Sequence, residues 1–353
     1  MNLNELKEFY SGKRVFITGD TGFKGAYLAR ILRIFGADVT GYALDPPTDP
    51  SVFALTGLDG EIRHIKGDVR DFERMRAALS DARPEVVFHL AAQPIVRESY
   101  RIPRETFEIN IMGTVNLLEA VRETGSVRSV VNVTTDKVYQ NLEERRGYRE
   151  DDPLDGYDPY SNSKSCSDLV THSYRSSFFG ESGPAVSTAR AGNVIGGGDF
   201  AKDRLIPDCV RAAMRGETII LRNPDSVRPF QHVLEPLGVY LLIAAAQERD
   251  RSLAGAYNVG PGPEDAVTAG HLADLFTEAW GDGASWTARP DGGPHEAGLL
   301  MLDSSKICDE LGWRPVWRIG DAVRKTVEWS RVYAAGGDLA AETDRQIGEY
   351  FHV

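Results

Sequence analysis

Two pairs of residues in this sequence can move protons, and each pair has a spacing that brings its members together. Asp136 and Lys137 are neighbours in TTDKVY, directly after an apolar, β-branched run that is typical of a strand. Tyr160 and Lys164 are four residues apart in DPYSNSKS, so a helix would place both on one face. The first pair places an acid beside a base at the end of a strand, and in the second pair an ammonium near a phenol favours the phenolate that removes a hydroxyl proton.

A glycine-rich loop indicates a dinucleotide site. Gly19, Gly22 and Gly25 follow the first apolar run in VFITGDTGFKGAYL and begin a helical pattern. Glycines at this spacing allow a tight turn and let backbone N–H groups at a helix N-terminus approach a pyrophosphate. We therefore expect this loop, including Thr21, Phe23 and Lys24, to hold the cofactor.

Asp45 ends the second expected strand, where a carboxylate accepts both ribose hydroxyls and repels a 2′-phosphate. This position favours NAD over NADP, although Asp45-Pro46-Pro47 is also a plausible turn and Lys24 keeps NADP open as an alternative. Further along, Asp68 and Val69 follow the third strand and are expected to flank the adenine. Small residues after the fourth strand would allow the backbone to approach the cofactor closely. The predicted contacts there are Leu90, Ala91 and Ala92.

The elements that position these residues alternate between strands and helices, which predicts a Rossmann-type, doubly wound parallel α/β sheet with sites at the strand carboxyl ends. The expected strands are Arg14–Thr18, Asp38–Tyr42, Glu61–Lys66, Glu85–His89, Ser129–Thr134 and Ala185–Arg190. The expected helices are Gly22–Phe35, Asp71–Leu79, Pro103–Thr124 and Tyr160–Phe179. We divide the chain into an NAD-binding domain (1–192, with a returning segment at about 230–260) and a smaller, interleaved substrate-binding lobe (mainly 193–353).

Composition narrows the classes of partner. The net charge of −12 gives no electrostatic support for nucleic acid or an anionic membrane, and the longest apolar run is too short to cross a bilayer. Three scattered cysteines and seven scattered histidines predict neither a disulfide framework nor a metal site. With a charged N-terminal stretch that does not resemble a secretion signal, these features predict a soluble, cytoplasmic protein.

At this point the sequence resembles the extended short-chain dehydrogenase/reductase family. The resemblance covers nearly the whole chain and narrows to the nucleotide-sugar 4,6-dehydratases, most closely the branch that acts on CDP-glucose. The stretches that carry it are GDTGFKGAYL, GYALDPPTDPSVF, FHLAAQPIVRESY, TTDKVY, GYREDDPLDGYDPYSNSKSCSDLV, RAGNVIGGGDFAKDRLIPD and VRPFQHVLEPL.

The resemblance implies a role for each reactive residue. Tyr160, supported by Lys164, takes the C4 hydroxyl proton while hydride passes to NAD, and Thr135 bonds that hydroxyl. The 4-keto group acidifies C5; Lys137 is then the base at C5 and Asp136 the acid for the departing C6 hydroxyl, before hydride returns to C6. dTDP-glucose dehydratases carry Asp-Glu here, so the Asp-Lys version indicates the CDP-sugar branch.

The charges of the acid and base pose a difficulty. An ion pair between Asp136 and Lys137 would favour a carboxylate and an ammonium, the wrong forms for both roles. We therefore expect a site sealed from water, in which both are uncharged, and we expect successive side chains to point apart, which weakens direct pairing. The alternative is a solvated pair that caps the strand.

Substrate contacts follow from the resemblance. The family's diphosphate-binding positions match Asn193, Arg228 and Asn258, and Leu205 and His295 are further substrate contacts. Arg228 is also compatible with a surface salt bridge, and Asn258 with a turn. The chain departs from close relatives at 141–146 and 298–301, which leaves the nucleotide and the hexose open.

The resemblance also implies a homodimer, through a four-helix bundle of Pro103–Thr124 and Tyr160–Phe179 from two copies. Two other functions remain: a nucleotide-sugar C4 epimerase or oxidoreductase on the same scaffold, and a cofactor-sensing regulator without turnover. An epimerase has no use for an acid and base at C5 and C6, and a sensor has no need of all four reactive residues.

Overall fold

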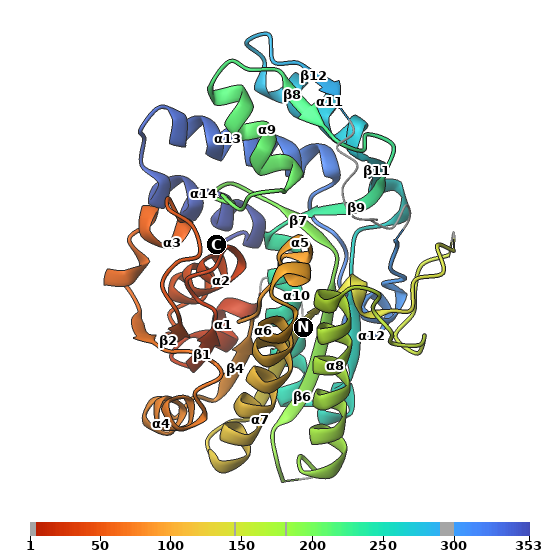
Figure 1. The fold of residues 1–353 in the computed structure, drawn as a ribbon. Helices are drawn as coiled ribbons and strands as arrows, with labels where there is room; N and C mark the ends of the chain where they lie inside the picture. Colours follow the sequence, from red (N-terminus) through yellow and green to blue (C-terminus); the bar gives the residue numbers. More distant parts are fainter. Residues whose placement is uncertain (1–4, 145, 181, 290–299) are drawn as a thin grey trace.

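Seven parallel strands form the central sheet of the computed structural model, which describes residues 5–144, 146–180, 182–289 and 300–353 (Figure 1). The strand order is β3-β2-β1-β4-β5-β6-β10, and all neighbouring pairs are parallel. The order reverses between β1 and β4, where ligands bind in such sheets. The predicted doubly wound α/β fold is therefore confirmed. The strands are β1 (Arg14–Thr18), β2 (Asp38–Ala43), β3 (Arg63–Lys66), β4 (Val86–His89), β5 (Ser129–Thr135), β6 (Ala185–Ala191) and β10 (Ala256–Val259).

Helices cover both faces of this sheet (Figure 1). On one face, α10 is buried at every residue from Leu234 to Gln247, as expected for a helix that is apolar on all sides. It packs there with α2 and α1, while α4, α7 and α8 enclose a second apolar cluster on the opposite face. These helices are α1 (Leu6–Tyr10), α2 (Phe23–Ile34), α4 (Phe72–Ala82), α7 (Gly113–Glu123), α8 (Pro159–Ser177) and α10 (Leu234–Arg249).

The single helix predicted over Pro103–Thr124 is wrong in detail. A π-helical turn, Glu108–Met112, separates α6 (Pro103–Phe107) from α7. The wider turn places the Asn110 amide where it donates to Ser163 Oγ at 2.8 Å and accepts from the Gln93 backbone N–H at 2.9 Å. Asn110 thus connects the segment after β4 to the helix that carries Tyr160 and Lys164, in line with the frequent occurrence of π turns near functional sites.

A smaller lobe lies over one end of the sheet (Figure 1). It contains the sheets β11-β9-β7 and β12-β8, and its apolar core lies between α9, α11 and α13. Between β9 and β11, the chain passes back to the main body, where α10 packs on the large sheet and β10 joins its edge. The lobe strands are β7 (Asn193–Ile195), β8 (Ile219–Leu221), β9 (Val227–His232), β11 (Ala266–Thr268) and β12 (Trp286–Ala288). The remaining helices are α3 (Val52–Leu55), α5 (Val96–Arg101), α9 (Leu205–Met214), α11 (Ala269–Trp280), α12 (Ser305–Leu311), α13 (Ile319–Ala334) and α14 (Leu339–Phe351).

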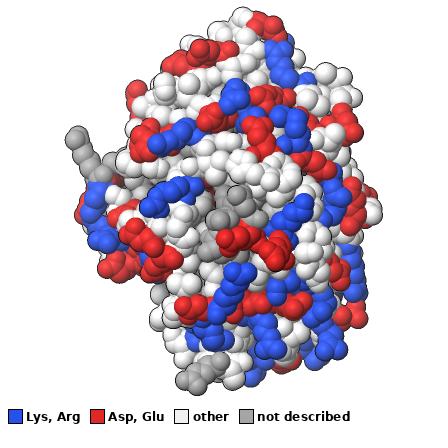
Figure 2. Space-filling model, turned by 180° about the vertical axis from the view of Figure 1, so that it is seen from behind, with Lys and Arg blue, Asp and Glu red and all other residues white. Residues whose placement is uncertain are grey.

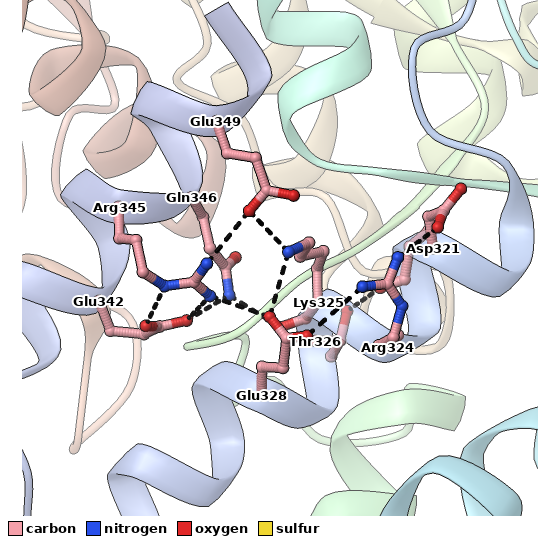
Figure 3. Close-up of polar contacts among 10 residues, drawn as sticks. Asp321, Arg324, Lys325, Thr326, Glu328, Glu342, Arg345, Gln346 and Glu349 are labelled. Carbon is pink, nitrogen blue, oxygen red and sulfur yellow. Dashed lines mark hydrogen bonds and ion pairs between the residues drawn. The ribbon is translucent and has the colours of Figure 1, made fainter. Parts of the chain in front are cut away.

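An ion network joins the last two helices (Figure 3). Lys325 of α13 is 3% exposed, and its ammonium lies 2.7 Å from Glu349 of α14 and 3.2 Å from Glu328. Arg345 of α14 reaches Glu328 at 2.9 Å, so the helices are connected by reciprocal pairs. The end of the chain is also tied to the glycine-loop helix, because Arg30 of α2 lies 2.6 Å from Asp344.

The surface carries mixed charge. On the face behind that of Figure 1, basic and acidic side chains are interspersed, with uncharged areas between them (Figure 2). Among the described residues, every helix is too short or too polar to cross a bilayer. The same residues bring together no cluster of three or more histidine, cysteine or acidic side chains suited to a metal ion.

Candidate active site

The glycine loop has the geometry of a pyrophosphate cradle. Gly19 has a φ of +80°, and a Cβ there would lie 2.7 Å from the backbone nitrogen of Ala91. A Cβ on Gly25 would lie 2.0 Å from the Gly19 carbonyl oxygen, so neither glycine tolerates a side chain. Gly22 caps α2 in extended conformation, which leaves the first N–H groups of that helix directed at the switch point.

The other candidate cofactor residues border this cradle. The Thr21 hydroxyl donates to the Leu44 carbonyl at 3.0 Å, Phe23 begins α2, and Val69 is buried. Leu90, Ala91 and Ala92 follow β4, where the Ala91 N–H donates to Thr18 Oγ1 at 3.3 Å. The structure thus brings these residues together at the carboxyl ends of β1, β3 and β4.

The two acidic candidates differ in their surroundings. The Asp45 side chain is 73% exposed and lies 2.5 Å from Lys66 Nζ. Asp68 accepts hydrogen bonds from the guanidinium and backbone N–H of Arg70, which lower the pKa of its carboxyl. Both carboxylates lie where the adenosine half of a dinucleotide is expected. Asp45 is paired with Lys66, and Asp68 is paired with Arg70.

Lys24 does not face the ribose side. Its ammonium donates to the Tyr240 hydroxyl on α10 at 3.3 Å and lies 5.7 Å from the centre of that ring. Burial, with a smaller contribution from Lys164, lowers the pKa of Lys24 to about 7. Lys24 therefore lies toward Tyr240 and Lys164, away from the expected ribose position, and we no longer expect it to bind a 2′-phosphate.

A hydrogen-bonded pair of Asp20 and His64 beneath the glycine loop was not expected from sequence. Asp20 is fully buried and one of its carboxylate oxygens lies 2.7 Å from His64 Nδ1 of β3. The hydrogen bond to Asp20 raises the pKa of His64, against the opposing effect of burial. The pair joins the glycine loop to the outer strand of the sheet.

We expect Asp20→Asn to lose about 2 kcal/mol of unfolding free energy at low pH, because a charge-assisted hydrogen bond is removed. A raised pKa in the folded state stabilises fully below the unfolded histidine value of about 6.5, and this stabilisation disappears as pH rises through the folded value. Urea unfolding at about pH 6 and about pH 9 should therefore show a larger difference at the lower pH. Asp81→Asn, at an exposed pair with Arg63, is the control, and an equal loss at both pH values would contradict the prediction.

The reacting residues converge at the end of β5 and the start of α8. Tyr160 and Lys164 are 9% and 4% exposed, and the Lys164 ammonium donates to the Val133 carbonyl at 3.0 Å. Thr135, the last residue of β5, is hydrogen-bonded to Tyr160. Its hydroxyl also donates to Asp136 Oδ1 at 2.9 Å. The four predicted proton-transfer groups and Thr135 thus form one connected site.

The expectation that Asp136 and Lys137 point apart is wrong. Lys137 Nζ lies 2.8 Å from Asp136 Oδ1, because the chain turns at Asp136–Val138 into a 3₁₀ segment instead of continuing as an extended strand. Successive side chains alternate only while the backbone is extended. The Asp136 side chain is fully buried and that of Lys137 is 27% exposed, so the acid is sealed by protein and the base reaches the surface of the site.

The pKa of Tyr160 differs from the expected lowering. Burial raises the pKa of its phenol to about 12, and the negative charge of Asp136 adds to this, while the hydrogen bond with Thr135 and the positive charge of Arg204 lower it. Lys164 is itself desolvated, and burial lowers the pKa of its ammonium to about 8. The protein alone therefore keeps Tyr160 protonated, and ionisation needs additional positive charge beside the ring.

Among the substrate candidates, Asn193 is well placed. Its side-chain oxygen accepts from Lys137 Nζ at 3.2 Å, which puts it against the acid and base. Leu205 begins α9, and Arg228 on β9 is 9% exposed with Nη1 donating to the Val227 carbonyl at 2.8 Å. His295 lies outside the described residues.

Asn258 is occupied by protein partners. It is fully buried; its oxygen accepts from the Tyr139 hydroxyl at 2.6 Å, and its nitrogen donates to the Tyr148 and Asp303 carbonyls at 2.7 and 3.1 Å. These bonds hold the loop after β5 against the segment before α12. We therefore leave Asn258 out of the proposed diphosphate contacts.

Asn258→Ala should lower the free energy of unfolding by about 3 kcal/mol, because three buried polar groups lose their partner. The KM for the nucleotide sugar should change by less than about twofold if the residue has no substrate contact. Denaturant unfolding and steady-state kinetics on the same preparation test both statements. Asn223→Ala, in a turn of the smaller lobe, is the control, and a large rise in KM with unchanged stability would restore the diphosphate role.

Sequence reasoning missed Arg204 and Asp168. Arg204 ion-pairs with Asp199 at 3.0 Å, and its charge acts on both Tyr160 and Lys24, so it lies beside the reacting groups. Its place directly before Leu205 in DRLIPD was the available signal. Asp168 receives a bidentate Arg190 guanidinium and the Thr134 hydroxyl, and its signal was the four-residue spacing from Lys164 on the same helix.

The described residues of the two stretches that depart from relatives meet at Tyr148, whose hydroxyl accepts from the Leu142 N–H at 2.7 Å. The Tyr148 backbone N–H donates to the Met301 carbonyl at 2.9 Å, and the Asp303 N–H donates to the Tyr148 carbonyl at 2.8 Å. The Tyr148 ring stacks on Tyr139 at 5.3 Å, and Leu142 nearby in the chain is 62% exposed. Tyr148 therefore links the described residues of both departures within the loop that follows β5.

Comparison with known proteins agrees with this geometry. A family model described as GDP-mannose 4,6 dehydratase matches residues 16–326. The CDP-glucose 4,6-dehydratase of Salmonella typhimurium is 47% identical over 350 residues, which cover 98% of each chain. The dTDP-glucose 4,6-dehydratase of Streptomyces griseus is 32% identical and covers 89% of this chain and 93% of its own.

Solved structures are similar over the same extent. DesIV, a dTDP-glucose 4,6-dehydratase from Streptomyces venezuelae with NAD and TYD bound, has a TM-score of 0.78 at 28% identity and covers 92% of this chain and 99% of its own. The UDP-glucose 4-epimerase of Thermotoga maritima has a TM-score of 0.77 at 23% identity, covering 90% of this chain and 99% of its own, which indicates a shared fold. The chain therefore belongs to the nucleotide-sugar 4,6-dehydratases, the family described as GDP-mannose 4,6 dehydratase, within the extended short-chain dehydrogenase/reductases.

Proposed function

We propose that the chain uses NAD to remove water from CDP-glucose and forms the 4-keto-6-deoxy sugar. The observation that carries this proposal is the contact of Asp136 with Lys137 beside Tyr160 and Lys164, because elimination needs an acid and a base in addition to a hydride-transfer site. The 47% identity with a CDP-glucose 4,6-dehydratase over 98% of the chain supports the substrate.

The cradle at Gly19 and Gly25 fits NAD, because added Cβ atoms would fill the space in which backbone approaches backbone. Asp45 would hold the adenosine ribose and disfavour a 2′-phosphate. When bound, NAD accepts hydride from C4 and returns it to C6, so no cofactor is consumed. The positive nicotinamide would also favour the Tyr160 phenolate that burial opposes.

In the first half of the proposed reaction, Thr135 bonds the C4 hydroxyl and Tyr160 removes its proton as hydride leaves C4. Lys164 and Arg204 supply positive charge near the phenolate. The resulting 4-keto group acidifies the C5 hydrogen.

In the second half, Lys137 takes the C5 proton while Asp136 protonates the departing C6 hydroxyl, which leaves as water. Hydride then returns to C6, and the Lys137 ammonium gives a proton back to C5. Shifting one proton across the 2.8 Å contact converts the ion pair into a neutral acid and a neutral amine.

The proposed diphosphate contacts are Asn193, Arg204 and Arg228, with Leu205 beside them, and His295 remains a predicted contact. An arginine fork can donate two parallel bonds to a phosphate. The loop that carries the exposed Leu142, held by Tyr148 and Met301 beneath it, would border the nucleotide and is where base preference should depart from that of close relatives.

Mass spectrometry on purified protein tests the proposal directly. With NAD present, CDP-, dTDP-, UDP- and GDP-glucose are supplied in parallel, and the 4-keto product is followed by the loss of one water and by alkaline absorbance. We expect CDP-glucose to react at least about tenfold faster than the others, a discrimination of about 1.4 kcal/mol. Unchanged mass with inverted C4 would identify an epimerase, and NAD binding without conversion of any hexose would identify a sensor.

We further propose that the protein is a cytoplasmic homodimer. Met112, Leu169 and Phe178, from the π-helical turn, α8 and its end, are 48%, 52% and 55% exposed, and α7 packs against α8. Two copies would bury this face in a four-helix bundle. Light scattering after size exclusion should give twice the chain mass, and Leu169→Glu should give monomers. The three cysteines are free thiols, as expected in a reducing compartment.

A further inference from the structure

A cavity of about 220 Å³ lies on the side of α8 away from its catalytic start, between the second half of that helix and the edge of the sheet at β6 and β10. A water molecule occupies about 30 Å³ in the liquid, so the cavity holds a ligand of several heavy atoms. Six of its nine lining residues are charged or polar, Glu150, Asp168, His172, Arg175, Thr188 and Arg190, and the others are Leu154, Leu169 and Ala256.

In this cavity, the Arg175 guanidinium uses only some of its N–H donors in hydrogen bonds. Its Nη1 donates to the Val186 carbonyl at 3.4 Å, and its Nη2 lies 3.1 Å from His172 Nδ1. A guanidinium has five N–H donors. Within the described ranges, no carboxylate lies at ion-pair distance from Arg175, so its remaining donors have no anionic partner.

The two neighbouring carboxylates are bound by other groups. Asp168 is bound in bidentate fashion by Arg190, at 2.9 Å to each oxygen, and also accepts from Thr134 and Thr188. One Glu150 oxygen accepts from the Asn258 backbone N–H at 2.8 Å. Burial lowers the pKa of Arg175, and the positive charge of Arg190 adds to this against the opposing charge of Asp168. A half-buried arginine beside a second arginine is a site that an added anion stabilises.

We propose that this cavity binds a small oxyanion, a phosphate or carboxylate group, through the Arg175 guanidinium, with the His172 ring at its side. The planar guanidinium offers parallel N–H bonds that match two oxygens of either group. Glu150 on the same cavity wall suits a hydroxyl or ammonium on the rest of the ligand, which points to a small phosphorylated or carboxylated metabolite in preference to a bare ion.

The cavity is separate from the proposed active site, but helix α8 contributes residues to both. Arg175 lies eleven residues beyond Lys164 on α8, or about 16 Å along the helix axis. Asp168, in the cavity wall, accepts from the Thr134 hydroxyl directly before Thr135. A bound oxyanion would therefore act on the wall that supports the catalytic strand without contacting the substrate.

Isothermal titration calorimetry tests the proposal with the chain saturated by NAD and CDP, which occupy the expected phosphate-binding positions of the active site. Sodium phosphate and sodium citrate are titrated at constant ionic strength, and comparison of the two distinguishes a phosphate from a carboxylate ligand. We expect saturable binding of at least one anion and at least a tenfold loss of affinity in Arg175→Gln. Arg104→Gln, which removes a 91% exposed arginine paired with Glu108, is the matched control and should bind as the wild type does.

Arg175→Lys keeps a positive charge and guards against a variant that fails to fold; it should bind with intermediate affinity and unchanged circular dichroism. Equal affinity in the wild type and Arg175→Gln would overturn the proposal, as would the absence of saturable binding by either anion. The result is independent of which hexose the enzyme accepts, because neither variant alters a proposed catalytic or substrate contact.

Discussion

Lys137→Met should oxidise the sugar at C4 yet release no 4-keto-6-deoxy product. The amine is the only group proposed to take the C5 proton, whereas C4 oxidation depends on Tyr160 and Thr135. Loss of a general base lowers a rate by about 10²–10⁴-fold. With CDP-glucose in a single turnover, enzyme-bound NADH should therefore accumulate while formation of the dehydrated sugar falls by about 10³-fold.

A second variant at the same position separates the ability of Lys137 to accept a proton from its positive charge. Lys137→Arg keeps a cation beside Asp136, which the Lys137 ammonium contacts at 2.8 Å, but a guanidinium stays protonated and cannot accept the C5 proton. It should therefore fail in the same way, which a purely electrostatic role would not predict. Lys7→Met, on the exposed side of α1, is the control. Dehydration at the wild-type rate in Lys137→Met would remove Lys137 from the mechanism.

Tyr160→Phe should block the reaction one step earlier. Without the phenol, the C4 hydroxyl proton has no acceptor, so both NADH formation and dehydration should fall by about 10³-fold. NAD affinity, measured by calorimetry, should change little, because the glycine cradle is intact. Tyr157→Phe, three residues earlier and 85% exposed, is the matched control.

The pH dependence of this step follows from the burial of Tyr160. Because burial raises the pKa of its phenol to about 12 in the protein alone, the active phenolate is the minor form at neutral pH. The rate of C4 oxidation in the wild type should rise with pH until the phenol in the ternary complex is ionised. Tyr160→Phe should lack this rise. A pH-independent rate in the wild type would show that Tyr160 is not the group that ionises.

Much of the fold follows from local sequence patterns. The strands predicted at Arg14–Thr18 and Ser129–Thr134 differ from β1 and β5 by at most one residue, because β-branched, apolar runs form buried parallel strands. Gly19 and Gly25 are recognisable for a similar reason: a side chain at either position would overlap backbone that is close in the chain or in the adjacent strand. Spacing alone also placed Tyr160 and Lys164 on one helix face.

Partners distant in sequence were not predictable in this way. The π-helical turn at Glu108–Met112 interrupts a continuous helical pattern because Asn110 bonds to Gln93 and Ser163. Asn258 follows a strand end like a ligand-binding residue, yet Tyr139, Tyr148 and Asp303 consume its amide. Lys24 sits in the glycine loop, but its side chain reaches α10 and Tyr240.

By itself the sequence determined the parallel sheet and the glycine cradle and singled out the four candidate proton-transfer groups, since these depend on periodicity and on spacings of a few residues. Only the tertiary structure decided that Asp136 contacts Lys137, that Tyr160 is held protonated by burial, and that Arg204 stands beside it. The reason is that charge and protonation depend on desolvation and on neighbours brought together by packing, and neither is encoded in a local pattern.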